Sequence, residues 1–142
     1  MSDQDRDEHD IRVKFWNSCR EGILRIQWCQ ECDKWQFYPR YLCRHCGSRA
    51  VEWREAAGIG TVETFSIVNR AEGIFAELTP YVVALVRLSE GPTMMTNVVG
   101  TTDSPLNVAT VSIGMPVRVL FEERDGQVLP LFTPVSPDTV RV

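Results

Sequence analysis

Residues 29–47 read CQECDKWQFYPRYLCRHCG, and this stretch decides how the chain is organised. Cys29 and Cys32 form one Cys-x-x-Cys pair, and Cys43 and Cys46 form a second pair. Each pair can present two thiolates to one ion, and four thiolates complete the closed tetrahedral shell of a structural zinc site. The two pairs therefore predict one structural Zn²⁺ held by these four cysteines.

Two other interpretations of the cysteine pairs are open, namely two disulfides or a redox-active pair. Disulfides are rare in the reducing cytosol, and nothing in the sequence indicates secretion. A redox Cys-x-x-Cys needs only one pair, set in a βαβ pattern that this sequence lacks. Gly47 directly follows the second pair, and its tolerance of a positive φ angle suits a zinc knuckle.

The fifth cysteine, Cys19, lies outside the two pairs, in the segment that precedes them. A catalytic thiol needs a neighbouring base. The chain has two histidines, His9 in the acidic N-terminal segment and His45 between two predicted ligands. We therefore expect Cys19 to be a buried, inert thiol.

Length and composition describe an ordinary folded protein of 142 residues, with 44% hydrophobic residues. This size suits one domain or two small ones. No apolar run approaches the roughly 20 residues of a membrane span. The first ten residues, MSDQDRDEHD, are acidic and do not resemble a targeting peptide. The expected location is the cytoplasm.

Apolar periodicity predicts an amphipathic helix near the N-terminus. Residues 1–9 are interpreted as a frayed end, Asp7 or Asp10 as the helix cap, and Gly22 as the stop. One face of this helix carries Ile11, Phe15, Trp16 and Cys19. The helix either packs on its own chain or docks on a partner, and the sequence does not decide between the two.

The rest of the chain is predicted to be mainly β. Strands are expected at residues 23–28, 51–54, 60–68, 81–88, 93–99, 117–121 and 128–132, with a loop at 70–80 and a loose tail from Pro134. The last five strands favour a small barrel such as the OB-fold, although an SH3-like barrel or a small sandwich fits the pattern nearly as well. The predicted units are the acidic tail and helix (1–24), a rubredoxin-like zinc ribbon (25–55), a five-stranded OB-fold barrel (56–136) and a tail (137–142), with a hinge at residues 56–58.

The order of these features resembles a known family, the zinc-ribbon OB-fold proteins associated with acyl-CoA metabolism. The resemblance covers roughly residues 12–133. It rests on the cysteine pairs together with these matching stretches: Phe15-Trp16, Glu21-Gly22, Phe37-Tyr38-Pro39-Arg40, Gly60-Thr61-Val62, the PYVVALV run of residues 80–86, Gly91-Pro92, Thr96-Asn97 and the IGMPV run of residues 113–117.

The resemblance implies a non-catalytic accessory subunit that binds one structural zinc through the four cysteines. Members of the family accompany thiolase-like enzymes, including acetyl-CoA acetyltransferases and aldolases, and others accompany enoyl-CoA hydratases. The expected partner is therefore a thiolase-like subunit, with acyl-CoA bound by the complex. A hydratase is the alternative partner.

Large aromatic residues and arginines cluster in the first 54 residues. Exposed aromatic patches often mark interfaces, so Phe15, Trp16, Trp35, Phe37 and Tyr38 are the predicted partner interface. Residues 20–54 hold seven Lys or Arg against four Asp or Glu. Arg40 and Arg44 are the predicted contacts to the phosphates of CoA. The loop at 70–80 is expected near the acyl-CoA entrance.

Two other functions compete with an accessory role. A nucleic-acid-binding module is the second hypothesis, because zinc ribbons and OB-folds both occur in such proteins. Four thiolates and one Zn²⁺ change the formal net charge from −4 to −6, and the barrel half is acidic, so no nucleic-acid partner is expected. A free-standing hydrolase or acyltransferase would need a nucleophile and a base, and two poorly placed histidines do not supply them.

Overall fold

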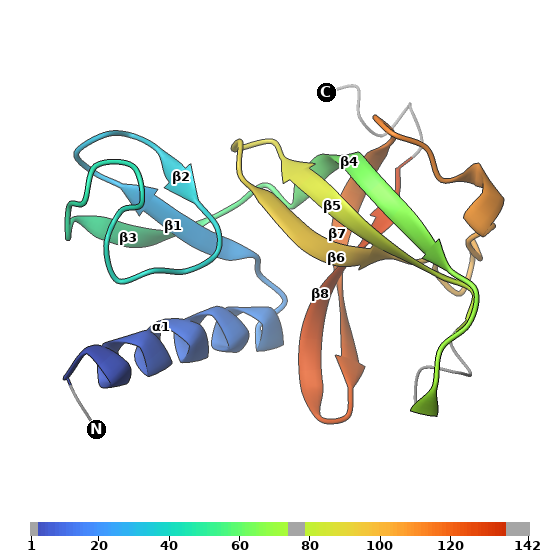
Figure 1. Ribbon diagram of the computed structural model, residues 1–142, viewed down its shortest axis with the longest axis horizontal. Coiled ribbons are helices and arrows are strands. Elements are labelled where there is room, and N and C mark those ends of the chain that lie inside the picture. The colour runs from blue at the N-terminus through green and yellow to red at the C-terminus, as the bar shows by residue number, and fades with distance from the viewer. Residues whose placement is uncertain (1–2, 74–78, 136–142) are drawn as a thin grey trace.

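The computed structural model describes residues 3–73 and 79–135, which form one long helix, a small antiparallel sheet and a closed barrel (Figure 1). These elements confirm the predicted mainly β fold with an N-terminal helix. Within the described residues, no helix combines the length and apolarity needed to cross a membrane.

Helix α1 spans Asp3–Arg20, so the prediction of a frayed end to residue 9 with a cap at Asp7 or Asp10 was wrong. No Gly or Pro interrupts residues 3–20, and nothing in the sequence therefore delays the helix start. The predicted stop is confirmed. Gly22 has a φ of 76°, its N–H donates to the Cys19 carbonyl, and the N–H of Ile23 donates to the Ser18 carbonyl. These two bonds are the Schellman arrangement that satisfies the last helical carbonyls.

The ribbon sheet has three antiparallel strands in the order β2-β1-β3: β1 is Arg25–Cys29, β2 is Trp35–Gln36 and β3 is Val51–Glu55. Strand β1 begins two residues later than predicted, because residues 23–24 complete the helix cap and its exit. Strand β2 has only two residues, which is too short for alternation to reveal it in the sequence.

The barrel contains all five strands that the sequence predicted. They are β4 Ile59–Val68, β5 Tyr81–Leu88, β6 Thr93–Val98, β7 Pro116–Arg124 and β8 Gln127–Pro134. They close in the order β4-β5-β6-β8-β7, with β7 pairing back to β4. Only β6 and β8 pair in parallel among the described strands. This closed Greek-key barrel is the OB-fold and excludes the sandwich alternative.

The β7–β8 hairpin is longer than predicted at both ends. Pairing runs from Arg124 opposite Gln127 at the turn to Val117 opposite Pro134 at the base. Pro134 therefore ends strand β8 and does not belong to a loose tail, a position where a proline is tolerated because the ladder stops there. The predicted loop at 70–80 lies partly outside the described residues, which omit 74–78.

One hydrophobic core crosses the predicted boundary between ribbon and barrel. Buried residues from α1, the ribbon and the barrel form a single cluster: Phe15, Cys19, Leu24, Ile26, Phe37, Val82, Val86, Met94 and Phe132 are among its members. Helix α1 contacts both β1 and β8, which places it across the two units (Figure 1). The predicted hinge at residues 56–58 is held by hydrogen bonds to neighbouring segments. The N–H of Ala56 donates to the Leu24 carbonyl, and the N–H of Ala57 donates to Glu90 Oε2.

Candidate metal centre and adjoining interface

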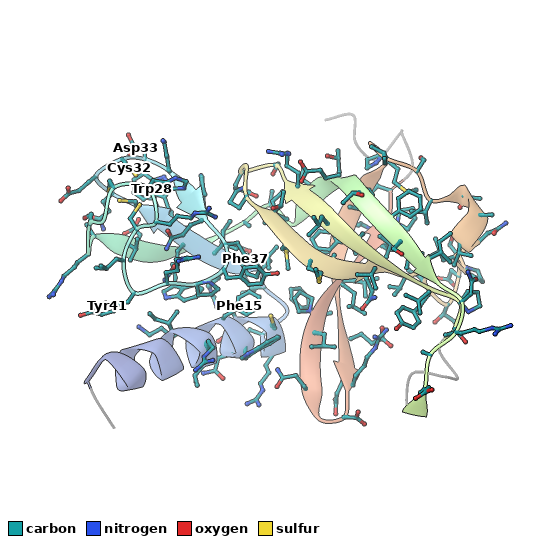
Figure 2. All side chains as sticks on the ribbon, viewed as in Figure 1. Phe15, Trp28, Cys32, Asp33, Phe37 and Tyr41 are labelled. Carbon is teal, nitrogen blue, oxygen red and sulfur yellow. The ribbon has the colours of Figure 1, made fainter. Side chains whose placement is uncertain are left out.

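The four predicted ligands converge at one point of the ribbon. The ligand atoms of Cys29, Cys32, Cys43 and Cys46 all lie within 4.8 Å of one another. The Sγ atoms of Cys29 and Cys46 are 3.6 Å apart, and those of Cys32 and Cys43 are also 3.6 Å apart. Figure 2 shows Cys32 at the end of the ribbon that lies farther from α1.

This geometry fits a tetrahedral metal–thiolate centre. Zn–S bonds of 2.3 Å in a tetrahedron place the sulfurs about 3.8 Å apart, close to the observed separations. A disulfide needs sulfurs about 2.05 Å apart, so the geometry excludes the disulfide interpretation. The four cysteines are therefore positioned to bind one metal ion. Such a site has no open position for a water or substrate, so it stabilises structure and does not activate a reactant.

The two knuckles are the turns that hold Cys29 and Cys32 and that hold Cys43 and Cys46. Both have the same backbone hydrogen-bond pattern. In the first, the N–H of Asp33 donates to the Cys29 carbonyl at 3.0 Å; in the second, the N–H of Gly47 donates to the Cys43 carbonyl at 2.9 Å. Both residues have a positive φ, 58° at Asp33 and 77° at Gly47. The prediction for Gly47 is confirmed. Sequence reasoning missed Asp33, because aspartate adopts this conformation less commonly than glycine.

The spacer between the knuckles is held by two buried glutamine side chains. Gln27 and Gln36 are each only 2% exposed, and Gln36 Nε2 donates to Gln27 Oε1 at 2.6 Å. Gln27 Oε1 accepts from the N–H of Arg40 at 2.7 Å, and Gln27 Nε2 donates to the Arg40 carbonyl at 2.8 Å. Gln36 Oε1 accepts from the N–H of Arg44 at 2.8 Å. We call this pair the amide clasp. It fixes the backbone at both predicted CoA-binding arginines.

An apolar groove lies where the helix, the ribbon and the barrel meet. Its volume is about 380 Å³. Its walls come from α1 (Phe15, Trp16), the spacer (Phe37, Tyr38) and the barrel strands β6 and β8 (Met95, Leu129). The rings of Phe15 and Phe37 lie 5.4 Å apart, and those of Phe37 and Tyr38 lie 4.4 Å apart. Figure 2 shows Phe15 and Phe37 facing each other at this junction.

The groove brings together four of the five predicted interface aromatics, but their exposure differs from the prediction. Phe15 and Phe37 are buried in the core, so neither presents its ring as an exposed part of the predicted interface. The barrel and helix cover them. Trp16 is half-buried and Tyr38 is 56% exposed. Trp35 lies in β2 on a different surface, beside His45.

A second cleft, of about 450 Å³, lies between α1 and the second knuckle. It is lined by both predicted CoA-binding arginines, Arg40 and Arg44, together with Arg12 from α1. Sequence reasoning missed Arg12, because 28 residues separate it from Arg40 and only the packing of α1 on the ribbon joins them. We call it the arginine cleft. It shares Arg12 and Pro39 with the apolar groove, so the two hollows adjoin.

Cys19 is completely buried, as the sequence predicted. Burial raises the pKa of the Cys19 thiol from its ordinary value of 9.0 to about 11, so the thiol is protonated at neutral pH. His45 is exposed and its Nε2 lies 3.3 Å from the Trp35 carbonyl, whereas Cys19 lies in the core. The inertness of Cys19 stays a prediction.

Comparison with known proteins identifies the family. Residues 16–52 match the family model of the ChsH2 rubredoxin-like zinc ribbon domain, and residues 53–122 match that of the ChsH2 C-terminal OB-fold domain. The chain belongs to the ChsH2-type, or DUF35, family. This assignment confirms the family resemblance seen in the sequence and agrees with a ribbon that binds one metal ion through four cysteines.

Two relatives of the ChsH2 type are described as an enzyme subunit and as a scaffold protein. A probable enoyl-CoA hydratase alpha subunit of Thermomonospora curvata is 37% identical over 125 residues, which are 87% of this chain but 37% of that subunit. The chain thus spans little more than a third of that relative. A DUF35 domain-containing scaffold protein of Methanocaldococcus jannaschii is 31% identical over 119 residues, which are 80% of each chain.

A solved structure shares the ChsH2-type fold over most of its length. A chain of the Ltp2-ChsH2(DUF35) aldolase superposes with a TM-score of 0.75 at 34% sequence identity, covering 87% of this chain and 93% of that chain. The helix, ribbon and barrel described above therefore form the arrangement that also occurs in an aldolase assembly.

Proposed function

We propose that the chain is a non-catalytic accessory subunit of an acyl-CoA-processing complex. Its partner is a thiolase-like enzyme of the acetyltransferase, acyltransferase or aldolase class. The subunit docks on this partner through the apolar groove and helps to hold the acyl-CoA. We place the complex in the cytoplasm, because zinc thiolates need a compartment that keeps cysteines reduced.

The observation that carries the proposal is the apolar groove at the meeting point of helix, ribbon and barrel. Three elements from different parts of the chain build it, and two side chains on its rim, Tyr38 and Met95, are 56% and 60% exposed. Aromatic residues and methionine are enriched at protein interfaces. The metal centre is coordinatively closed, and the buried Cys19 is packed in the hydrophobic core. The chain therefore offers a surface for binding and no assembled catalytic group in its described part.

The relatives support the class of partner. The aldolase structure joins a ChsH2(DUF35) chain with Ltp2, and the archaeal relative is described as a scaffold. The Thermomonospora curvata relative is described as a hydratase alpha subunit, which favours a hydratase as the second candidate partner. Both partners act on acyl-CoA thioesters, so the proposed role of this chain is the same with either.

A co-expression pull-down with the candidate partner tests the docking surface. Tyr38→Ala and Trp16→Ala should each weaken assembly by about 30-fold, because truncating a central interface aromatic commonly costs about 2 kcal/mol. Ile113→Ala is the matched control, since Ile113 is 70% exposed on the barrel and does not line the groove. Wild-type assembly by both aromatic variants, with folded protein by circular dichroism, would show that the groove is not the interface.

The proposed acyl-CoA contact makes a separate prediction. Replacing Arg40 and Arg44 together by alanine should raise the KM for acyl-CoA in the assembled complex without weakening assembly. The backbone of both residues is held by the amide clasp, so the loss of their side chains should leave the spacer in place.

A further inference from the structure

We infer that the arginine cleft is a three-arginine subsite for the phosphate-bearing end of CoA, with Arg12 of α1 as its third member. The inference rests on the proposed function and deepens it: it adds a residue from a different element and assigns the direction in which the ligand lies. Arg12, Arg40 and Arg44 contact the phosphates, and the thioester arm extends toward the apolar groove.

The cleft has the charge that a phosphate ligand requires. Three arginines line it, and no Asp or Glu is among its lining residues. Within residues 11–73 and 79–135, the ion pairs involve Arg25, Arg54, Arg87 and Arg124, and none involves the three arginines of the cleft. All three side chains are exposed and can reach a ligand in the cleft. Arginine binds phosphate oxygens with two parallel N–H donors.

The amide clasp gives the cleft a fixed frame. Gln27 and Gln36 are buried, and their side chains hold the backbone N–H groups of Arg40 and Arg44 at 2.7 and 2.8 Å. Buried side-chain amides are costly unless their hydrogen bonds are made, so this network holds the spacer in one conformation. The backbone of both arginines is therefore held before a ligand binds, which lowers the entropy lost on binding.

The position of the cleft beside the apolar groove assigns the ligand class. A free inorganic anion would need the cleft alone. CoA carries three phosphate groups at one end and a long arm at the other, and the cleft and the groove share Arg12 and Pro39. The cleft alone measures about 450 Å³, within the roughly 300–1,000 Å³ of ordinary ligand pockets, so the arm leaves it toward the groove and the docked partner.

A different role for the arginines must be distinguished from this one. Four thiolates around Zn²⁺ carry a formal charge of −2, and nearby arginines could offset it. Arg40 and Arg44 flank the ligand Cys43, but Arg12 comes from α1. Charge compensation predicts a loss of zinc when the arginines are replaced. Phosphate binding predicts a loss of CoA affinity at full zinc content.

The test is titration calorimetry of CoA into the zinc-loaded full chain and into the assembled complex. Arg12→Gln, Arg40→Gln and Arg44→Gln should each weaken CoA binding by about tenfold, since a hydrogen bond to a charged group contributes at least this much. Lys14→Gln is the matched control, because Lys14 is exposed on the same helix but does not line the cleft. It should change the affinity less than twofold. Dephospho-CoA, which lacks the 3′-phosphate, should bind wild type more weakly than CoA.

Three results would overturn the inference. The first is an unchanged CoA affinity in Arg12→Gln with the fold intact. The second is a loss of zinc in the arginine variants without a change in CoA affinity, which would assign the arginines to the metal centre. The third is a loss of assembly at unchanged CoA affinity, which would assign the cleft to carboxylates of the partner. Arginine variants that assemble and bind CoA like the wild type refute only this inference. A wild-type chain that does not assemble with the partner refutes the proposed function.

Discussion

The ribbon and the barrel are joined in one core but are stabilised by different interactions. The ribbon encloses two buried amides and four convergent thiols, and its sheet has strands of five, two and five residues. The barrel encloses fully buried apolar side chains such as Val82, Val86 and Phe132. The ribbon therefore depends on metal coordination and hydrogen bonds, and the barrel depends on apolar packing.

This difference explains where the two hollows lie. Metal coordination and the amide clasp hold the backbone of the spacer. The large aromatic and cationic side chains of the spacer are therefore not all needed to fill a hydrophobic core. The barrel supplies a rigid apolar wall through β6 and β8, and α1 contributes Phe15, Trp16 and Arg12. Both hollows are therefore bounded by rigid elements although the ribbon itself has little apolar core.

Metal removal should have the largest effect on stability, and it should unfold the ribbon while the barrel stays folded. Binding of structural Zn²⁺ to ribbon-type sites contributes about 10 kcal/mol or more to folding. Chelation, or Cys43→Ser, should abolish hydrogen-exchange protection in residues 25–55 while amides of the β5 strand stay protected. Acid should have the same effect as a chelator, since the ligands must be deprotonated to bind. Full protection of the ribbon in metal-free protein would contradict this dependence.

A core truncation in the barrel should have the converse effect. Phe132 is fully buried, and Phe132→Ala should lower the free energy of unfolding by about 3–5 kcal/mol through lost burial and a cavity. Met95→Ala, at a side chain 60% exposed on β6, should change it by less than about 0.5 kcal/mol. Denaturant unfolding with zinc analysis checks both. One zinc per folded chain should persist in each variant.

Much of this architecture follows from the sequence because its determinants are local. The spacing of the cysteines, the helix stop at Gly22 and the alternation of the barrel strands are all properties of short segments. Strand β5, the most apolar, was predicted with its observed bounds, Tyr81–Leu88. Each Cys-x-x-Cys turn brings two of the four predicted ligands together, and the fold of the ribbon joins the two pairs.

The remaining features depend on tertiary contacts that short segments do not encode. The burial of Phe15 and Phe37 requires the barrel to cover the ribbon, and Arg12 meets Arg40 only because α1 packs there. The amide clasp joins β1 to β2, and β2 is too short to predict. The sequence therefore indicated Arg40 of the spacer and Arg44 of the second knuckle, but not Arg12 or the groove.

The amide clasp should contribute a smaller, ribbon-specific stability. Gln27→Ala leaves the N–H of Arg40 and the side-chain N–H of Gln36 without their acceptor, which should cost about 1–3 kcal/mol. Gln30→Ala is the control, because Gln30 is exposed and its bond to Glu52 lies at the surface. Chelator titrations should show zinc released more readily from Gln27→Ala than from the control. Equal release would mean that the clasp does not support the ribbon.

The two knuckles should respond unequally to substitutions at matching positions. Gly47→Ala places a Cβ at a φ of 77° with no contacting atom within 4 Å, so its cost of about 1 kcal/mol is purely conformational. Asp33→Gly removes the steric cost of the positive φ in the folded state but raises the conformational entropy of the unfolded chain. The net change in the free energy of unfolding should stay within about 0.5 kcal/mol. Thermal unfolding of both variants at saturating zinc measures the difference.

The central claim is that the chain assists an acyl-CoA enzyme and does not itself catalyse, and turnover measurements test it most directly. Acyl-CoA turnover should be measured for the zinc-loaded chain alone, for the partner alone and for the two together, with Cys19→Ser as an additional complex. The account predicts no turnover by the chain alone, greater turnover by the complex than by the partner alone, and wild-type turnover by the Cys19→Ser complex. Turnover by the purified chain alone that is lost in Cys19→Ser would contradict it.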